Sequence, residues 1–182
     1  MQLFDAPAQL HEAIAEKNET EGLSRVVAGY CWSWDTDHQD DGSFVDIEIG
    51  DYGRSWNRQA GDPWAIDEGS LNEVGCIHTC QGLEFEYVGV IIGPDLRYED
   101  GELVTDFRER ANQDQSVRGM KTLAKESPEE AATLADELIK NTYRTLMTRG
   151  MQGCYIYCCD DGLQEYLRGR LNDAMRTIEG AH

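Results

Sequence analysis

Two short stretches of the chain hold the side chains best suited to chemistry. The stretch 76–85 places a His-Thr pair and a Gln-Gly-Leu-Glu-Phe turn directly before an apolar run at 87–93. The stretch 143–150 ends a helical pattern with Thr148-Arg149, just ahead of another apolar run. Together they indicate half of a nucleotide-binding site. The half is incomplete, because the chain has no G-x-x-x-x-G-K-[ST] loop to hold a triphosphate and its magnesium ion.

The elements that must position these residues are strands and amphipathic helices in alternation. Apolar runs at 24–32, 87–93 and 154–158 predict buried strands. Apolar spacing of three and four predicts a helix from Pro128 to about 148 and a last helix at 163–178. This order predicts an α/β domain with a mostly parallel central sheet.

Local signals refine the ends of these elements. Asp5 is placed to cap a first helix, and Ser127 precedes a proline and two glutamates, as a helix N-cap does. Residues 94–126 are mixed in character and predict a peripheral insertion, with a short helix near 106–111. The buried stripe predicted for the last helix is Tyr166, Leu167, Leu171 and Met175.

Composition limits the classes of protein to which the chain can belong. Its 182 residues suit one domain, residues 1–182, and 40% hydrophobic residues suit a globular protein. No apolar run is long enough to span a bilayer, and no secretory signal follows Met1, so we expect no membrane association and a cytoplasmic location. The net charge of −19 argues against strong nucleic-acid binding by this domain alone. Any such role must be local or shared with a more basic domain.

The six cysteines and the tryptophans have structural interpretations. Several cysteines lie in apolar runs, where a free thiol behaves as a small hydrophobe. Cys76, His78 and Cys80 alternate along an extended segment and cannot close a tetrahedral cage, so no metal site is predicted. Trp32 and Trp34 could stack on bases, but core packing explains the same pattern and is favoured.

The motifs resemble those of a known group of proteins. The stretch 79–88 resembles the superfamily 1 helicase motif in which a Thr and a Gly-Leu-Glu-Phe turn precede a core strand, and Thr148-Arg149 resembles the last motif of that superfamily. When the Arg-Val-Val-Ala-Gly-Tyr-Cys-Trp run at 25–32 is included, the sequence resembles still more closely the bacterial Schlafen group 3-like DNA/RNA helicase domain, a domain of unknown function. The resemblance covers about residues 1–170. It implies a three-layer, RecA-like second domain of a P-loop NTPase.

This resemblance implies roles for the nucleotide side of the site. Gln81, Gly82 and Glu84 match the turn beside the nucleotide, with Glu84 the candidate ligand of the ribose hydroxyl. Arg149 matches the arginine finger, whose planar charged fork stabilises charge on the transferred phosphoryl group. A structural alternative is that Gly82 only permits a turn with positive φ, and that Arg149 pairs with helix carbonyls or a carboxylate.

Two neighbouring residues carry an implied contact with nucleic acid. His78 and Thr79 match positions that touch the nucleic-acid backbone in the helicases, and threonine is a normal phosphate-contacting residue. The alternative for His78 is a satisfied core histidine beside a buried strand.

Three hypotheses about function follow. In the first, the chain is the C-terminal half of an ATP-dependent helicase or translocase, its partner is an N-terminal RecA-like domain absent from this sequence, and ATP with Mg²⁺ binds only when that domain is present, with DNA or RNA as the substrate. In the second, it is a non-catalytic acidic protein-interaction module that keeps the fold. The third, a metal-dependent nuclease, lacks a set of carboxylates at a recognisable spacing.

Overall fold

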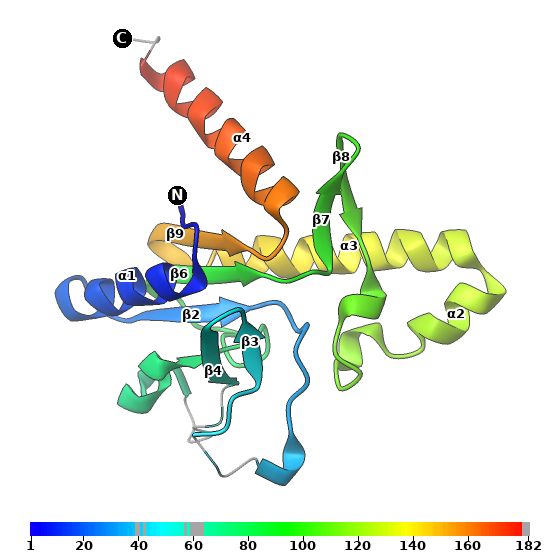
Figure 1. Ribbon diagram of the computed structural model, residues 1–182, viewed down its shortest axis with the longest axis horizontal. Coiled ribbons are helices and arrows are strands. Elements are labelled where there is room, and N and C mark those ends of the chain that lie inside the picture. The colour runs from blue at the N-terminus through cyan, green and yellow to red at the C-terminus, as the bar shows by residue number, and fades with distance from the viewer. Residues whose placement is uncertain (39–40, 42, 57, 59–63, 180–182) are drawn as a thin grey trace.

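A four-stranded parallel sheet forms the centre of the molecule in the computed structural model, which describes residues 1–38, 41, 43–56, 58 and 64–179 (Figure 1). Its strands, in spatial order, are β1 (Gln2–Leu3), β9 (Gly150–Cys158), β6 (Phe85–Ile92) and β2 (Ser24–Ala28). Every neighbouring pair is parallel. The predicted α/β class with a mostly parallel central sheet is therefore confirmed.

The register places β-branched side chains at the centre of the sheet. Val90 of β6 lies opposite Val27 on one side and Ile156 on the other. All three side chains are fully buried. Strands covered on both faces need such continuous apolar runs, which explains why the 87–93 run indicated a strand so clearly.

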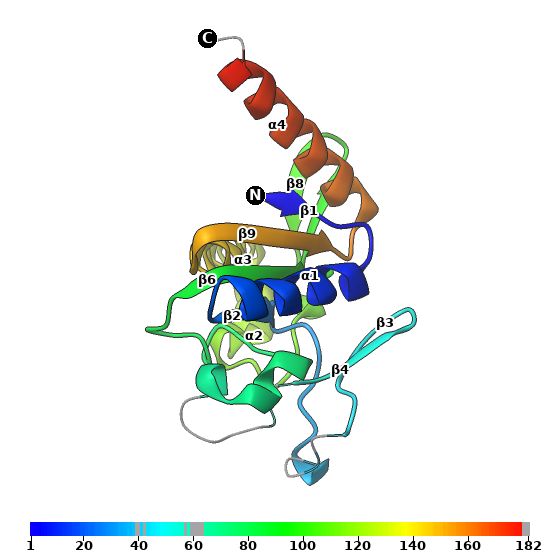
Figure 2. The same ribbon diagram turned by 90° about the vertical axis from the view of Figure 1, so that its left-hand side faces the viewer.

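Helices cover both faces of this sheet and complete the three layers (Figure 2). The first helix, α1 (Pro7–Thr20), packs on one face, and α3 (Pro128–Met147) packs on the other with the first turns of α4 (Asp161–Glu179). Alternation along β6 divides the core: Val88, Val90 and Ile92 belong to the α3 side, and Ile91 belongs to the α1 side. This arrangement is that of a RecA-like domain.

A smaller sheet extends the core beyond β2. It is formed by β3 (Ile47–Ile49), β4 (Tyr52–Trp56) and β5 (Glu73–Val74). The residue after β5, Gly75, pairs with Val27 of β2 in a parallel bridge. The chain from β5 therefore passes along the β2 edge before it enters the 76–85 stretch.

Residues 94–126 leave the sheet at the end of β6, as the expected insertion does. They contain a hairpin of β7 (Leu96–Glu99) and β8 (Glu102–Thr105), followed by 3₁₀ turns and by α2 (Met120–Glu126). Figure 1 shows this segment running from β6 to the distal end of α3. The predicted helix at 106–111 is only a 3₁₀ turn at 107–109, capped by the Asp106 side chain.

A buried polar network fastens the insertion to the sheet. The Tyr143 hydroxyl donates to Asp95 and accepts from the Gly93 amide at 2.9 Å. Arg110 donates to Asp95 at 3.0 Å and to Asp114 at 2.7 Å. Because these side chains are buried, each charge needs its partner, and the network fixes the path of residues 93–114.

Other predicted boundaries change for physical reasons. The predicted strand at 24–32 ends at Ala28, since the chain turns at Gly29, where any Cβ would lie 2.0 Å from the Tyr143 hydroxyl. Ala6, not Asp5, occupies the N-cap of α1, and Asp5 pairs instead with Arg168. Ser127 is the N-cap of α3, but its side chain makes no capping hydrogen bond.

The last helix departs from its predicted burial. Leu163 is buried and Leu167 is half-buried, but Met175 is 54% exposed, because the second half of α4 extends away from the sheet (Figure 1). Of the predicted stripe, Tyr166, Leu167 and Leu171 are thus half-buried, and Met175 is exposed. Among the described residues, no helix has both the length and the apolar character needed to cross a membrane.

Candidate functional site

The 76–85 stretch forms a tight turn between β5 and β6 that Thr79 holds together. Its hydroxyl accepts from the Cys76 amide at 2.9 Å and donates to the Cys76 carbonyl at 3.0 Å. The Cys80 amide donates to the same carbonyl at 3.2 Å. Thr79 also lies against Gly75, where the Trp64 ring leaves no room for a side chain. The Thr79 hydroxyl therefore serves the backbone of the turn.

The end of the turn depends on Gly82. Its φ of 78° lies in the left-handed region, and no heavy atom lies within 4 Å of the place where a Cβ would be. The backbone conformation, and not crowding, therefore requires glycine. This confirms the expected turn with positive φ. Leu83 then donates to the Cys80 carbonyl at 3.2 Å, and β6 starts at Phe85.

The turn and the C-terminal half of α3 enclose a pocket of about 400 Å³. His78 and Gln81 face it from the turn, and Arg149 faces it from just beyond the helix end. Its full lining is Ile77, His78, Gln81, Leu138, Asn141, Thr142, Thr145 and Arg149. The two stretches that are far apart in the sequence thus meet in one polar pocket with an apolar floor.

The backbone of Arg149 is held by two hydrogen bonds, while its side chain makes few contacts. Its amide donates to the Leu146 carbonyl at 3.2 Å, and its carbonyl accepts from the Phe85 amide at 2.8 Å. The guanidinium makes one long contact, from Nη1 to the Leu83 carbonyl at 3.5 Å. Its Nε is buried without a hydrogen-bond partner among the described residues. Neither structural alternative, a carboxylate or the carbonyls of its own helix, is therefore found among the contacts of the described residues.

The positive charge of Arg149 affects the pKa of Cys80 in the turn. Burial and, to a smaller extent, Cys76 raise the pKa of the Cys80 thiol to about 11, while the Arg149 guanidinium acts in the opposite direction. A neutral thiol at this position leaves the cation uncompensated. The pocket therefore favours an anionic group beside Arg149.

The structure separates the other predicted site residues. Glu84 is exposed and, like Gly82 and Thr79, does not line the pocket. His78 is exposed, so it is not a core histidine, and it shares the pocket with Gln81. The roles of these residues toward nucleotide and nucleic acid remain predictions.

Three pocket residues on α3 were missed from the sequence: Asn141, Thr142 and Thr145. A signal was present, because Asn141 and Thr145 are four residues apart on one helix face, and Arg149 follows at the same interval just past the helix end. Thr142 donates its hydroxyl to the Leu138 carbonyl at 2.9 Å, whereas Asn141 accepts from Arg144 at 3.0 Å. The amide of Asn141 is thus a polar group available at the rim.

No three His, Cys, Asp or Glu side chains converge to hold a metal ion in the part of the chain that the structure describes. The six cysteines are free thiols, four of them buried. The pocket residues fit a phosphate-bearing ligand through one guanidinium, an imidazole and amides. They supply neither a phosphate-cradling loop nor carboxylates for Mg²⁺.

Comparisons with known proteins are consistent with this geometry. Residues 1–160 match the family model described as Schlafen group 3, DNA/RNA helicase domain. The uncharacterized protein YPL245W of Saccharomyces cerevisiae is 28% identical over 169 residues, which are 91% of this chain and 36% of the yeast protein. The chain therefore spans about a third of the length of this curated relative. No solved structure gives a significant match.

Proposed function

The chain belongs to the Schlafen group 3 DNA/RNA helicase domain family, and we propose that it is the second RecA-like half of an ATP-dependent helicase or translocase of the superfamily 1 type. In this proposal ATP lies between two domains, in a cytoplasmic protein. An N-terminal RecA-like domain supplies the phosphate-binding loop and the Mg²⁺ ligands. This chain supplies Arg149 and the turn that carries Gln81.

The state of Arg149 is the observation that carries the proposal. Its guanidinium lies in an open pocket, with Nε buried and unpartnered among the described residues. The chain has 35 acidic residues, yet none forms an ion pair with Arg149 in the described part. A partly buried cation without a partner is costly, and a phosphate group would offset that cost.

Arg149 is suited to the transition state of phosphoryl transfer. When water attacks the γ-phosphorus, the bond to the leaving ADP oxygen breaks and negative charge develops on the phosphoryl oxygens. A planar guanidinium can donate to two of these oxygens at once. Gln81 lines the same pocket from the turn, and Glu84 is proposed to reach the ribose hydroxyl from the exposed end of the turn.

The test is steady-state ATP hydrolysis by the two-domain protein with Arg149→Ala. We expect kcat to fall about 1,000-fold or more, the scale of a lost arginine finger. Arg144→Ala is the matched control, because this exposed arginine lies on α3, five residues before Arg149, and does not line the pocket. Equal losses in both variants would contradict the role of Arg149.

The isolated chain, residues 1–182, should hydrolyse little or no ATP. Robust hydrolysis by this chain alone would contradict the division of the site between two domains.

The alternative is a non-catalytic protein-interaction module, and the net charge of −19 is the observation that favours it. Such a module would bind a basic protein partner equally well with or without Arg149. Loss of ATP hydrolysis in the Arg149→Ala protein separates the two hypotheses, because the module hypothesis predicts no hydrolysis to lose.

A further inference from the structure

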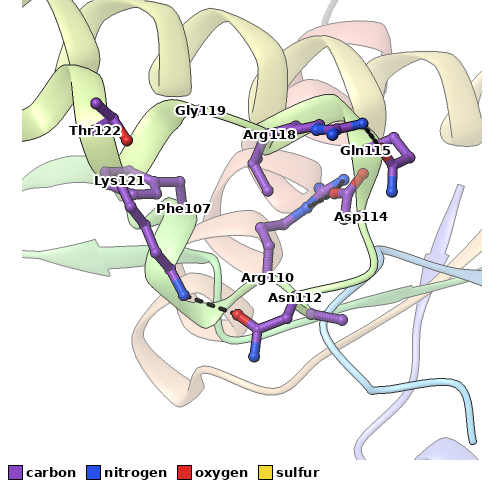
Figure 3. A pocket seen from close by; sticks show the side chains of 11 residues that line it. Phe107, Arg110, Asn112, Asp114, Gln115, Arg118, Gly119, Lys121 and Thr122 are labelled. Carbon is purple, nitrogen blue, oxygen red and sulfur yellow. Dashed lines mark hydrogen bonds and ion pairs between the residues drawn. The ribbon is translucent and has the colours of Figure 1, made fainter.

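A second pocket lies in the insertion, in a segment of the chain where cations outnumber acids. Residues 107–125 hold five Lys or Arg and two Asp or Glu, a net charge of +3, so the rest of the chain carries −22. The 3₁₀ turns of this segment and the start of α2 surround a pocket of about 250 Å³ (Figure 3). It shares no residue with the Arg149 pocket.

Two exposed cations of this pocket have no acidic partner. Lys121 donates to the Asn112 side chain at 2.8 Å, and Arg118 donates to the Gln115 side chain at 3.4 Å (Figure 3). Both acceptors are neutral amides, and neither cation forms an ion pair among the described residues. Each side chain uses only one of its donors, so the others are available to a ligand.

The wall of the pocket is rigid and almost neutral. Arg110 is buried and committed to Asp95 and Asp114. The second oxygen of Asp114 accepts from the Ser116 amide at 2.9 Å and from its hydroxyl at 2.6 Å. Because Asp114 is saturated in this way, it does not compete for Arg118 or Lys121. The ligand that fits is an anion.

Two half-buried aromatic residues contact the same segment through their backbone carbonyls. The Ala111 amide donates to the Tyr30 carbonyl at 2.8 Å, and Gln113 donates to the Trp34 carbonyl at 3.2 Å. These residues flank Asn112 of the pocket. The backbone of the strip 29–34 therefore runs beside the pocket. Tyr30 and Trp34 are half-buried, and the Tyr30 ring packs against Trp56 and His78. Cations that bind phosphate next to aromatic faces that stack on bases are the means by which proteins hold single-stranded nucleic acid.

From these contacts we infer that the insertion pocket binds a backbone phosphate of single-stranded nucleic acid through Arg118 and Lys121. The site lies outside the helicase-like motifs and adds a local cationic contact to an otherwise acidic domain. It rests on the proposed function only in the class of its ligand. The acidic remainder of the surface limits the affinity and makes it strongly dependent on salt.

The test measures binding of a labelled single-stranded oligonucleotide to the full chain by fluorescence anisotropy, from about 50 to about 200 mM salt. Arg118→Gln with Lys121→Gln should weaken binding about tenfold and reduce the salt slope by about 1.4, the value for two phosphate contacts on a single strand. The matched control is Arg108→Gln with Lys125→Gln. It removes the same charge from the same segment but from residues outside the pocket.

Several results would overturn the inference. Equal losses in the two double variants would show that only net charge matters, and no binding by the wild-type chain would exclude the site. Circular dichroism checks that both variants fold. Inorganic polyphosphate, which lacks bases, should bind more weakly and leave tryptophan fluorescence unquenched; binding as tight as that of the oligonucleotide would assign the pocket to free phosphate instead. Because no nucleoside triphosphate is present, the result is independent of the Arg149 experiment.

Discussion

The protonation state of His11 is determined by its buried surroundings. It is 5% exposed on α1, with Nδ1 2.8 Å from the Tyr52 hydroxyl and Nε2 2.7 Å from the Leu71 carbonyl. A carbonyl only accepts, so Nε2 carries the proton and Nδ1 accepts from Tyr52. Burial lowers the pKa of His11 to about 4, despite the opposing hydrogen bond to Leu71. The imidazole is therefore neutral in the folded protein at neutral pH.

This shift predicts a loss of stability in acid. The unfolded chain takes up the His11 proton near pH 6.5 and the folded chain only near pH 4, so the contribution is complete above pH 6.5 and is lost as pH falls through about 4. We expect the free-energy difference of unfolding between wild type and His11→Gln to shrink by up to about 3 kcal/mol between about pH 7 and about pH 4. Chemical denaturation at several pH values measures it. His78→Gln, which removes an exposed imidazole, is the control, and a constant difference for His11→Gln would contradict the assignment.

Helix α1 approaches strand β6 closely at Gly89. A Cβ on Gly89 of β6 would lie 2.8 Å from both Ile14 and Leu10 and 3.3 Å from Val26. Leu10 and Ile14 are fully buried. The helix therefore packs directly on the strand backbone at Gly89, and the glycine is explained by close approach.

This packing predicts opposite effects of alanine at two glycines. Gly89→Ala should lower the free energy of unfolding by about 1–3 kcal/mol, because overpacking displaces α1. Gly169→Ala should raise it by about 0.5–1 kcal/mol, because Gly169 lies within α4 and no heavy atom outside the helix would meet its Cβ within 4 Å. Urea denaturation of the two variants compares them directly. A stabilising Gly89→Ala would show that α1 can move away without cost.

At the scale of the whole molecule, the net charge of −19 is the largest unbalanced electrostatic feature. Self-repulsion among surface carboxylates destabilises a compact state, and salt screens it. The buried pairs, such as Arg58 with Asp46 and Arg110 with Asp95, are screened much less.

Salt should therefore stabilise this protein. Between about 0.01 and about 0.1 M sodium chloride the Debye length falls from about 30 to about 10 Å, so long-range repulsion is largely removed. We expect the midpoint of thermal unfolding to rise over this range, as followed by circular dichroism. Chloride is preferred to sulfate, because sulfate also strengthens apolar burial. A midpoint that falls with salt would indicate that attractive surface pairs outweigh the repulsion.

The sequence by itself determined the class of fold and the helix that ends just before Arg149. Apolar periodicity is a local property, and the 87–93 and 154–158 runs are apolar because both faces of their strands are covered. The left-handed conformation at Gly82 could also be predicted from the sequence, because few residues other than glycine adopt it. The family motifs also predict that Gln81 and Arg149 belong to one site, and both line the same pocket.

The tertiary structure decided which of these residues meet. The Thr79 hydroxyl bonds to the Cys76 backbone, and Glu84 does not line the pocket, whereas Asn141 and Thr145 line it from α3. The cationic pocket of the insertion arises because the network around Asp95 folds residues 107–122 back on themselves. Which side chains come together depends on contacts between segments that are distant in the chain. The periodicity within one segment does not predict those contacts.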